Sequence, residues 1–202
     1  MKTILKSLAM AFLLCAGTSL MAQDNAEMAA DKAQGGPSDA ENAAWEKAMA
    51  VGPMHKLLAS GAGEWKTDMK MWMAPNAEPQ TSTGSCMNEM ILGGRYQESK
   101  YESSVMGMPY EGRGLVGYDN LKNMFVNTWS DNMGTGIMYS EGPYDEKTNS
   151  ITFKGSYIDP MTGKEVKTRE VYKFVADNHH IFEMYATQEG KEFKSMEINY
   201  RR

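Results

Sequence analysis

Polar and apolar residues alternate along most of this chain from Trp65 onward. The first alternating run places one set of side chains on one face: Trp65, Thr67, Met69, Met71 and Met73. The intervening positions carry the charges of Lys66, Asp68 and Lys70. One apolar face and one charged face are typical of a strand in an antiparallel sheet with a single buried side.

Similar runs follow at intervals of roughly ten residues, separated by Gly, Pro, Asn and Asp at positions that favour tight turns. They cover residues 80–92, 95–104, 110–118, 124–130, 135–144, 150–158, 165–175, 179–188 and 192–200. Ten such strands in one open sheet would leave two long unpaired edges. The pattern therefore predicts an all-β fold, a ten-stranded antiparallel up-and-down barrel.

The period changes to that of a helix before the barrel. Apolar residues recur at helical spacing from about Asp39 to Ala59, and Gly52-Pro53 divides this stretch because proline interrupts a helix. Residues 23–40 are small and polar, which is typical of a flexible linker. We therefore expect a domain over residues 41–202, with a short helical segment at 41–60 and the barrel at 63–202.

The first 22 residues resemble a secretory signal peptide. Lys2 and Lys6 precede a short apolar run at residues 8–15, and Ala22 is a small residue suited to cleavage. The apolar run is shorter than the ~20 residues that span a bilayer. We expect export of the mature protein to the periplasm or the medium; an uncleaved anchor is the alternative.

Charge and cysteine content exclude several function classes. Removing the two lysines of residues 1–22 changes the formal net charge from −5 to −7. An acidic domain without clustered Lys or Arg is poorly suited to nucleic acid or to anionic membranes. Cys86 remains without a second cysteine in the mature chain, so packing must supply the stability. We expect no nucleic-acid partner and no membrane insertion after cleavage; the oligomeric state is left open.

The sequence Gly63-Glu64-Trp65 enters the first strand directly after a helix. It resembles the first signature of the lipocalin and calycin barrels. That resemblance implies that Trp65 closes one end of the barrel beneath an arginine that follows the last strand. Arg201 is assigned to this role, with Arg202 beside it.

A closer resemblance is carried by several motifs between residues 53 and 202. They are His55-Lys56-Leu57-Leu58, Gly63-Glu64-Trp65, Leu92-Gly93-Gly94-Arg95, the run GRGLVGYD at 112–119, the run TWSDNMGTG at 128–136, DPMTGK at 159–164 and MEINYR at 196–201. Together they are similar to DUF1579, a bacterial family of unknown function. The resemblance implies a calycin-like barrel with nitrobindin-type haem barrels as distant relatives, and it implies no activity.

Metal and haem sites find little support in the sequence. His179 and His180 are adjacent on one strand and face opposite sides, so they cannot share an ion inside the barrel. No group of Cys, His and Asp has zinc spacing. We expect no metal and no cofactor; haem bound through His180, which is in phase with Phe182 and Met184, is the alternative.

Alternation within each strand predicts which residues line the barrel interior. The predicted pocket wall consists of Met69, Met71, Tyr96, Trp129 and Tyr172. Asp131, Asn132 and Thr135 are predicted to form a polar mouth, with turn stabilisation as the alternative. Thirteen of the 19 methionines lie between residues 69 and 196. Such flexible, polarisable side chains suit an apolar ligand, plain core packing or a soft metal.

No catalytic motif is present, with neither a nucleophile elbow nor a phosphate-binding loop. Glu170 and Glu183 are in phase with aromatic residues of their strands, so either is a candidate inward carboxylate. We predict a barrel that binds a small, largely apolar ligand. The alternatives are a filled-core structural or interaction barrel, an enzyme with a buried unpaired Glu or His, and a haem-binding barrel.

Overall fold

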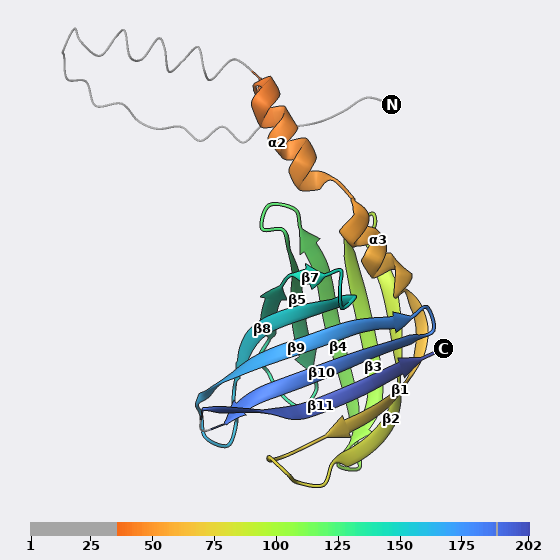
Figure 1. Ribbon diagram of the computed structural model, residues 1–202, viewed down its shortest axis with the longest axis vertical. Coiled ribbons are helices and arrows are strands. Elements are labelled where there is room, and N and C mark those ends of the chain that lie inside the picture. Colours follow the sequence, from red (N-terminus) through yellow and green to blue (C-terminus); the bar gives the residue numbers. More distant parts are fainter. Residues whose placement is uncertain (1–35, 189) are drawn as a thin grey trace, which may run out of the picture. The chain divides into compact units, whose positions relative to one another are not determined.

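The computed structural model describes residues 36–188 and 190–202 (Figure 1). The predicted signal peptide and most of the predicted linker lie outside these residues. Helix α2 (Asp39–Met49) begins two residues earlier than the predicted domain. Ser38 and Glu41 form a capping box that explains this start, because Ser38 N donates to Glu41 Oε2 at 2.8 Å and Glu41 N donates to Ser38 Oγ at 3.3 Å.

A second helix, α3 (Pro53–Ser60), follows after Gly52 and begins with the proline, which suits the first helical turn. It buries His55 and Leu58 and packs against β2, β3 and β4. Within residues 36–188 and 190–202, neither length nor hydropathy allows any helix to cross a bilayer.

The strands of the described residues follow the predicted runs closely. They are β1 (Gly63–Met71), β2 (Gln80–Ile91), β3 (Tyr96–Val105), β4 (Met108–Asp119), β5 (Met124–Asp131), β6 (Met138–Gly142), β7 (Tyr144–Asp145), β8 (Ser150–Ile158), β9 (Glu165–Ala176), β10 (His179–Gln188) and β11 (Lys191–Arg201). The run predicted at 135–144 is divided into β6 and β7. Pro143 lies at the division and has no N–H to contribute to a ladder.

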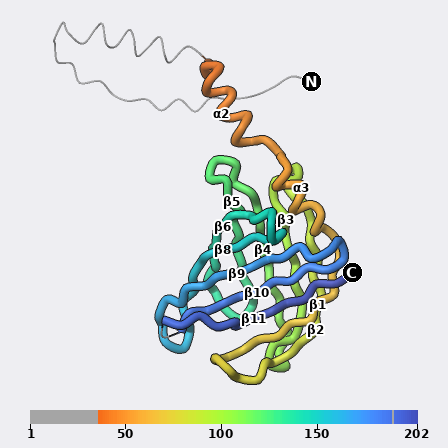
Figure 2. The backbone as a smooth tube through the Cα atoms, viewed as in Figure 1, coloured from red at the N-terminus to blue at the C-terminus, as the bar shows by residue number. Residues whose placement is uncertain are grey.

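The sheet closes on itself, as the backbone trace shows (Figure 2). Sequential strands pair from β6 back to β1, β1 pairs with β11, and the order continues through β10 and β9 to β8. Antiparallel pairing of β6 with β8 completes the ring, while the two-residue β7 pairs only with β8. The prediction of a ten-stranded antiparallel, calycin-like barrel is confirmed.

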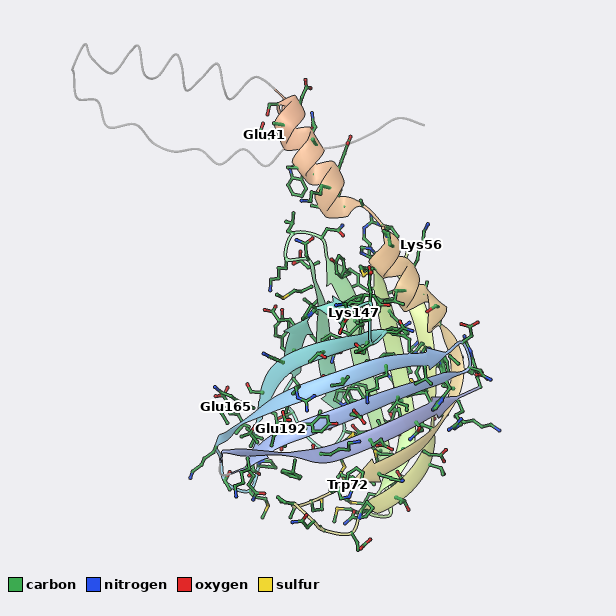
Figure 3. All side chains as sticks on the ribbon, in the orientation of Figure 1. Glu41, Lys56, Trp72, Lys147, Glu165 and Glu192 are labelled. Atoms are coloured by element: carbon green, nitrogen blue, oxygen red, sulfur yellow. The ribbon has the colours of Figure 1, made fainter. Side chains whose placement is uncertain are left out.

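The two ends of the barrel differ. Helix α3 lies across one end, over a buried cluster of Leu58, Phe125, Ile151, Phe153 and Phe174 (Figure 1). At the other end, here called the distal end, the strands β1, β3, β5, β8 and β10 finish and their hairpins or loops follow. Trp72, Glu165 and Glu192 mark the distal end, and Lys56 marks α3 (Figure 3).

The register of the ladders fixes which side chains face inward. In β1 the buried residues Trp65, Thr67 and Met69 alternate with exposed neighbours. Residues directly opposite one another in an antiparallel pair share a face. Trp65 lies opposite Cys86, Cys86 opposite Tyr101, and Tyr101 opposite Gly112, so the interior can be followed from strand to strand.

Candidate functional site

A depression of about 350 Å³ lies at the distal end, between the β1–β2 and β3–β4 hairpins. Its lining includes Met69, Met71, Ser82, Thr83, Val105 and Met106. The ladder between β2 and β3 stops at Gly84 and Ser103, whereas β2 continues along β1 to Gln80. The depression therefore occupies the gap where β2 separates from β3.

Gly84 and Ser103 explain how the two strands part. A Cβ at Gly84 would lie 2.3 Å from the Glu102 carbonyl oxygen, so only glycine permits the strands to cross this closely. Beyond that point Ser103 Oγ donates to the Thr83 carbonyl at 3.2 Å and replaces the ladder contact. The Oγ atoms of Ser82 and Ser103 are 3.2 Å apart.

Met69 and Met71, two residues of the predicted pocket wall, line the depression. Met69 is buried within a cluster around Trp65, and Met71 is half-buried at the distal end of β1. Apolar residues from other strands pack against the same cluster and remain half-buried: Val105, Tyr110, Trp129, Phe182 and Met196. These residues give the distal half of the interior an apolar surface that is partly accessible.

Trp129, another residue of the predicted pocket wall, faces inward and lies across two glycines of β4. A Cβ at Gly112 would meet the indole at 2.2 Å, and one at Gly114 would meet it at 3.1 Å. Trp129 Nε1 donates to Asp131 Oδ2 at 3.2 Å, and the Tyr110 hydroxyl donates to the same oxygen at 3.0 Å. Burial, together with the Asp131 charge, raises the pKa of Tyr110, so its phenol stays a donor.

The predicted polar mouth does not assemble. Asp131 faces the interior, but its neighbour Asn132 is exposed and ties two strands together: Asn132 Oδ1 accepts from Glu111 N at 3.0 Å. Thr135 is exposed in the loop that follows. Asp131 Oδ1 also accepts from Met133 N at 3.0 Å, which is the geometry of an Asx turn. Asp131 and Asn132 therefore act as in the alternative interpretation, in which their side chains stabilise the turn.

Tyr96 faces outward, so its prediction as pocket wall is wrong. It is an odd number of residues from Tyr101, and the two tyrosines of β3 must therefore lie on opposite faces. Tyr101 is the inward one, with 1% of its surface exposed. Tyr96 instead covers Gly117 on the outer face, where a Cβ would approach its ring to 2.6 Å.

Tyr172 faces inward but lies deep in the barrel rather than in the depression. It packs against both buried clusters, and its hydroxyl lies 2.9 Å from His180 Nδ1. Burial strongly raises the pKa of this phenol. Tyr172 is therefore a core residue, and the structure does not bring it together with Met71 or Trp129 at one surface.

The end of the barrel under α3 is closed by Trp65, whose Nε1 donates to the Gly61 carbonyl at 2.9 Å. The cation over its ring is Arg202, 4.3 Å from the centroid, and not the predicted Arg201. Tyr200 faces inward, so the next residue must face outward and the one after it inward. Arg201 accordingly lies opposite Lys66 and His179 on the outer face.

The surroundings of His180 do not fit a haem ligated by this residue. Its ring packs against Trp65, with centroids 4.5 Å apart, and against Phe174 at 5.0 Å. The Tyr172 hydroxyl is hydrogen-bonded to His180 Nδ1, and only 2% of His180 is exposed. Burial, followed by the Arg202 charge, lowers the pKa of His180 to about 4. Among the described residues no three His, Cys, Asp or Glu side chains gather as a metal site.

Glu170 is a fully buried carboxyl inside the barrel. Its neighbours are neutral: Ser140 Oγ donates to Oε2 at 3.1 Å, and Asn127 Nδ2 donates to the same atom at 3.3 Å. Thr168 Oγ1 donates to Oε1 at 3.5 Å. Burial raises the pKa of Glu170 against the lowering effect of these donors. Of the two carboxylates suggested by phase, Glu170 faces inward; Glu183 forms ion pairs with Lys173 and Lys194.

Several residues of this region were not predicted. For Tyr110 the available sequence signal is the spacing of Gly112 and Gly114, two positions without side chains on the same face of β4, which leave room for a large ring beside it. Ser82 and Val105 had no comparable signal, because the gap they line depends on how β2 and β3 part.

Burial raises the pKa of the Cys86 thiol to about 12, so it is a protonated, buried side chain.

Comparison with known proteins agrees with this architecture. Rv2717c from M. tuberculosis, a solved crystal structure, is similar in fold with a TM-score of 0.55 at 11% sequence identity, over 76% of this chain and 99% of that chain. No curated protein is similar enough in sequence to be matched. Residues 50–202 match the family model described as "Protein of unknown function (DUF1579)", and the chain belongs to this family.

Proposed function

We propose that this is an exported protein whose barrel binds a small, largely apolar molecule at its distal end. The observation that carries the proposal is the depression of about 350 Å³ between β2 and β3. Its volume lies within the range of small-molecule sites, ~300–1,000 Å³. Met69, Met71 and Val105 offer apolar surface, while Ser82, which lies opposite Met69, offers a hydroxyl group.

The lining suggests an amphipathic ligand. Methionine side chains have three rotatable bonds and adapt to irregular apolar shapes. On the β2 side of the depression, the Ser82 hydroxyl suits a hydroxyl, carbonyl or carboxyl group of the ligand. A molecule with an apolar body and one polar end would satisfy both sides. The acidic net charge of the chain disfavours a strongly anionic ligand.

Export is supported by the sequence of residues 1–22. Two lysines, a short apolar run and Ala22 have the order of a signal peptide. The measurement is N-terminal sequencing of the protein recovered from the periplasm. A start at Gln23 supports export with cleavage, and recovery of an uncleaved chain from the cytoplasm contradicts it.

Native mass spectrometry of the mature protein, residues 23–202, purified from its own compartment, tests binding. An additional mass of a few hundred daltons that disappears on denaturation is the expected result. Titration with a neutral, apolar fluorescent probe gives a dissociation constant for comparing variants. Met71→Lys places a charge in the depression and should weaken binding by more than about tenfold, since burying an unpaired charge costs several kcal/mol.

Met161→Lys is the matched control, because Met161 is 91% exposed in the β8–β9 connection. It should bind as the wild type does. Equal weakening by both variants, or a bare mass together with no stabilisation by a panel of lipids, would overturn the proposal.

One observation favours a second candidate, a filled-core interaction barrel. The α3 end contains large side chains with almost no exposure, including Trp65 at 2%, Phe125 at 0% and Ile151 at 1%. If the distal depression binds nothing, the barrel is a scaffold for its outer surface. A bare mass in the experiment above, combined with co-purification of a stoichiometric protein, would favour this candidate.

A further inference from the structure

Three methionines from three strands lie side by side at the distal end of the barrel. Met71 of β1 is directly opposite Met196 of β11, and Met196 is directly opposite Met184 of β10. Directly opposite residues in antiparallel strands have Cβ atoms ~4.5–5.5 Å apart. Each thioether is separated from its Cβ by one methylene, so the three sulfur atoms can approach a common point.

All three side chains belong to the inner face. Met71 is in phase with buried Met69, Met196 with buried Ile198, and Met184 lies opposite Met196 on the same face. Each of the three is half-buried, unlike the fully buried residues of the core. A small ion can therefore reach them from the distal end.

The same row continues to a buried carboxyl group. Glu170 of β9 lies directly opposite Met184 and is fully buried. Its hydrogen-bond donors, Asn127, Ser140 and Thr168, are all neutral. A cation beside Met184 would supply a positive charge near a carboxyl group whose hydrogen-bond partners, within residues 36–188 and 190–202, are neutral.

We propose that Met71, Met184 and Met196 form a thioether site for a soft monovalent cation, Cu(I) or Ag(I). Thioether sulfur is a soft donor that selects Cu(I) over hard cations such as Mg²⁺ or Ca²⁺. Thioethers need no deprotonation, so binding releases no proton from the ligands. The ion enters and leaves as a monovalent cation and no electron is transferred. The site shares Met71 with the depression of the proposed function, whereas Met184 and Met196 come from β10 and β11, and it does not depend on the apolar ligand.

Core packing is the competing explanation, and it makes a different prediction. Leucine has nearly the volume of methionine and packs well in a barrel, so Met→Leu would have little effect on a purely structural row. Leucine has no donor atom, so the same change removes a ligand from a metal site. The substitution Met196→Leu, at the central position, separates the two explanations.

The experiment uses Ag(I) as a redox-inert probe and the mature protein labelled with ¹³C at the methionine methyl groups. Addition of one equivalent of Ag(I) should shift the methyl signals of Met71, Met184 and Met196 before the others. Met196→Leu should weaken Ag(I) binding by more than about tenfold, since even loss of a residue supporting a metal ligand costs 10–100-fold in affinity. Met161→Leu, at a 91% exposed position, should leave the affinity unchanged.

Competition with a chromophoric Cu(I) chelator under anaerobic conditions repeats the measurement with copper. Near-UV circular dichroism checks that Met196→Leu remains folded. The methyl shifts of the wild-type protein identify the binding methionines even if no variant folds. Shifts spread over exposed residues such as Met73, Met106 and Met161, or equal affinity in Met196→Leu and the wild type, would overturn the site.

Discussion

The Arg202 guanidinium lies 4.3 Å from the centre of the Trp65 ring and holds three backbone carbonyls at the α3 end of the barrel. It donates to the carbonyl oxygens of Ala62 at 2.6 Å, Asp177 at 3.0 Å and Ser60 at 3.2 Å. The residue thus connects the segment after α3, the first strand and the β9–β10 turn. Its removal should loosen all three.

Arg202→Ala should lower the free energy of unfolding by about 2 kcal/mol, from a lost cation–π contact and lost hydrogen bonds. Urea denaturation measures this change. Arg201→Ala is the matched control because Arg201 is exposed on the outer face, and an effect within about 0.5 kcal/mol is expected. An equal loss in both variants would show that charge near the C-terminus, and not the contact with Trp65, matters.

His180 makes the protein sensitive to acid. Its pKa is lowered to about 4 by burial and by Arg202, whereas an unfolded histidine titrates near 6.5. Between these values the unfolded chain binds a proton that the native chain does not, so stability falls as the pH is lowered. The loss is at most about 3 kcal/mol between pH 7 and pH 4.

Proton NMR of the His180 Cε1–H signal tests this directly. We expect a titration midpoint near 4 that coincides with the onset of acid unfolding. A midpoint near 6.5 in the native protein would mean that the ring reaches solvent, contrary to its packing against Trp65 and Phe174.

The sequence predicted the faces of β1 because charged residues occupy every second position there. A charged side chain on the inner face would be costly, so alternation leaves only one orientation. The same reasoning failed at Tyr96 and at Arg201. In both places a similar residue stands at the other phase, Tyr101 and Arg202, and composition does not distinguish them. Only the register against the neighbouring strands determines which of the two residues faces inward.

The candidate sites were less predictable than the fold. Met71 and Met196 are far apart in the sequence, and only the pairing of β1 with β11 places them opposite each other. The depression arises where the β2–β3 ladder stops. No local sequence pattern predicts where this ladder ends. Alternation predicts the face of a residue, whereas a site requires the relative position of strands along the barrel axis.

Glu170 should destabilise the protein at neutral and alkaline pH. Burial raises its pKa, so the native carboxyl keeps its proton at pH values where the unfolded one, near 4.3, has lost it. The native chain then binds more protons than the unfolded chain, and stability falls as pH rises above about 4.3. Glu170→Gln removes this titration and preserves the size of the side chain.

As the pH rises from 4.5 to 8, the free energy of unfolding of Glu170→Gln should therefore increase relative to that of the wild type. Urea unfolding across this range measures it. Glu111→Gln, at an exposed position of β4, controls for the loss of one acidic group. A pH-independent difference for Glu170→Gln would contradict a buried, proton-binding carboxyl.

Gly112 and Trp129 provide a test of the distal interior. A Cβ at Gly112 would lie 2.2 Å from Cζ2 of the indole, which is closer than any real contact. In Gly112→Ala the ring must therefore move, and the bond from Nε1 to Asp131 breaks. Overpacking of this kind costs about 1–3 kcal/mol. Alanine is otherwise a better strand residue than glycine, so any loss comes from the displaced ring.

Near-UV circular dichroism and urea unfolding follow Gly112→Ala. A changed aromatic spectrum and a lower unfolding free energy are expected together. Gly134→Ala is the matched control, because nothing lies within 4 Å of a Cβ at that position. Because the indole supports the apolar interior next to the depression, Gly112→Ala should also weaken binding of the neutral fluorescent probe, while Gly134→Ala leaves it intact. Unchanged spectra in Gly112→Ala would mean that the ring of Trp129 does not cover β4.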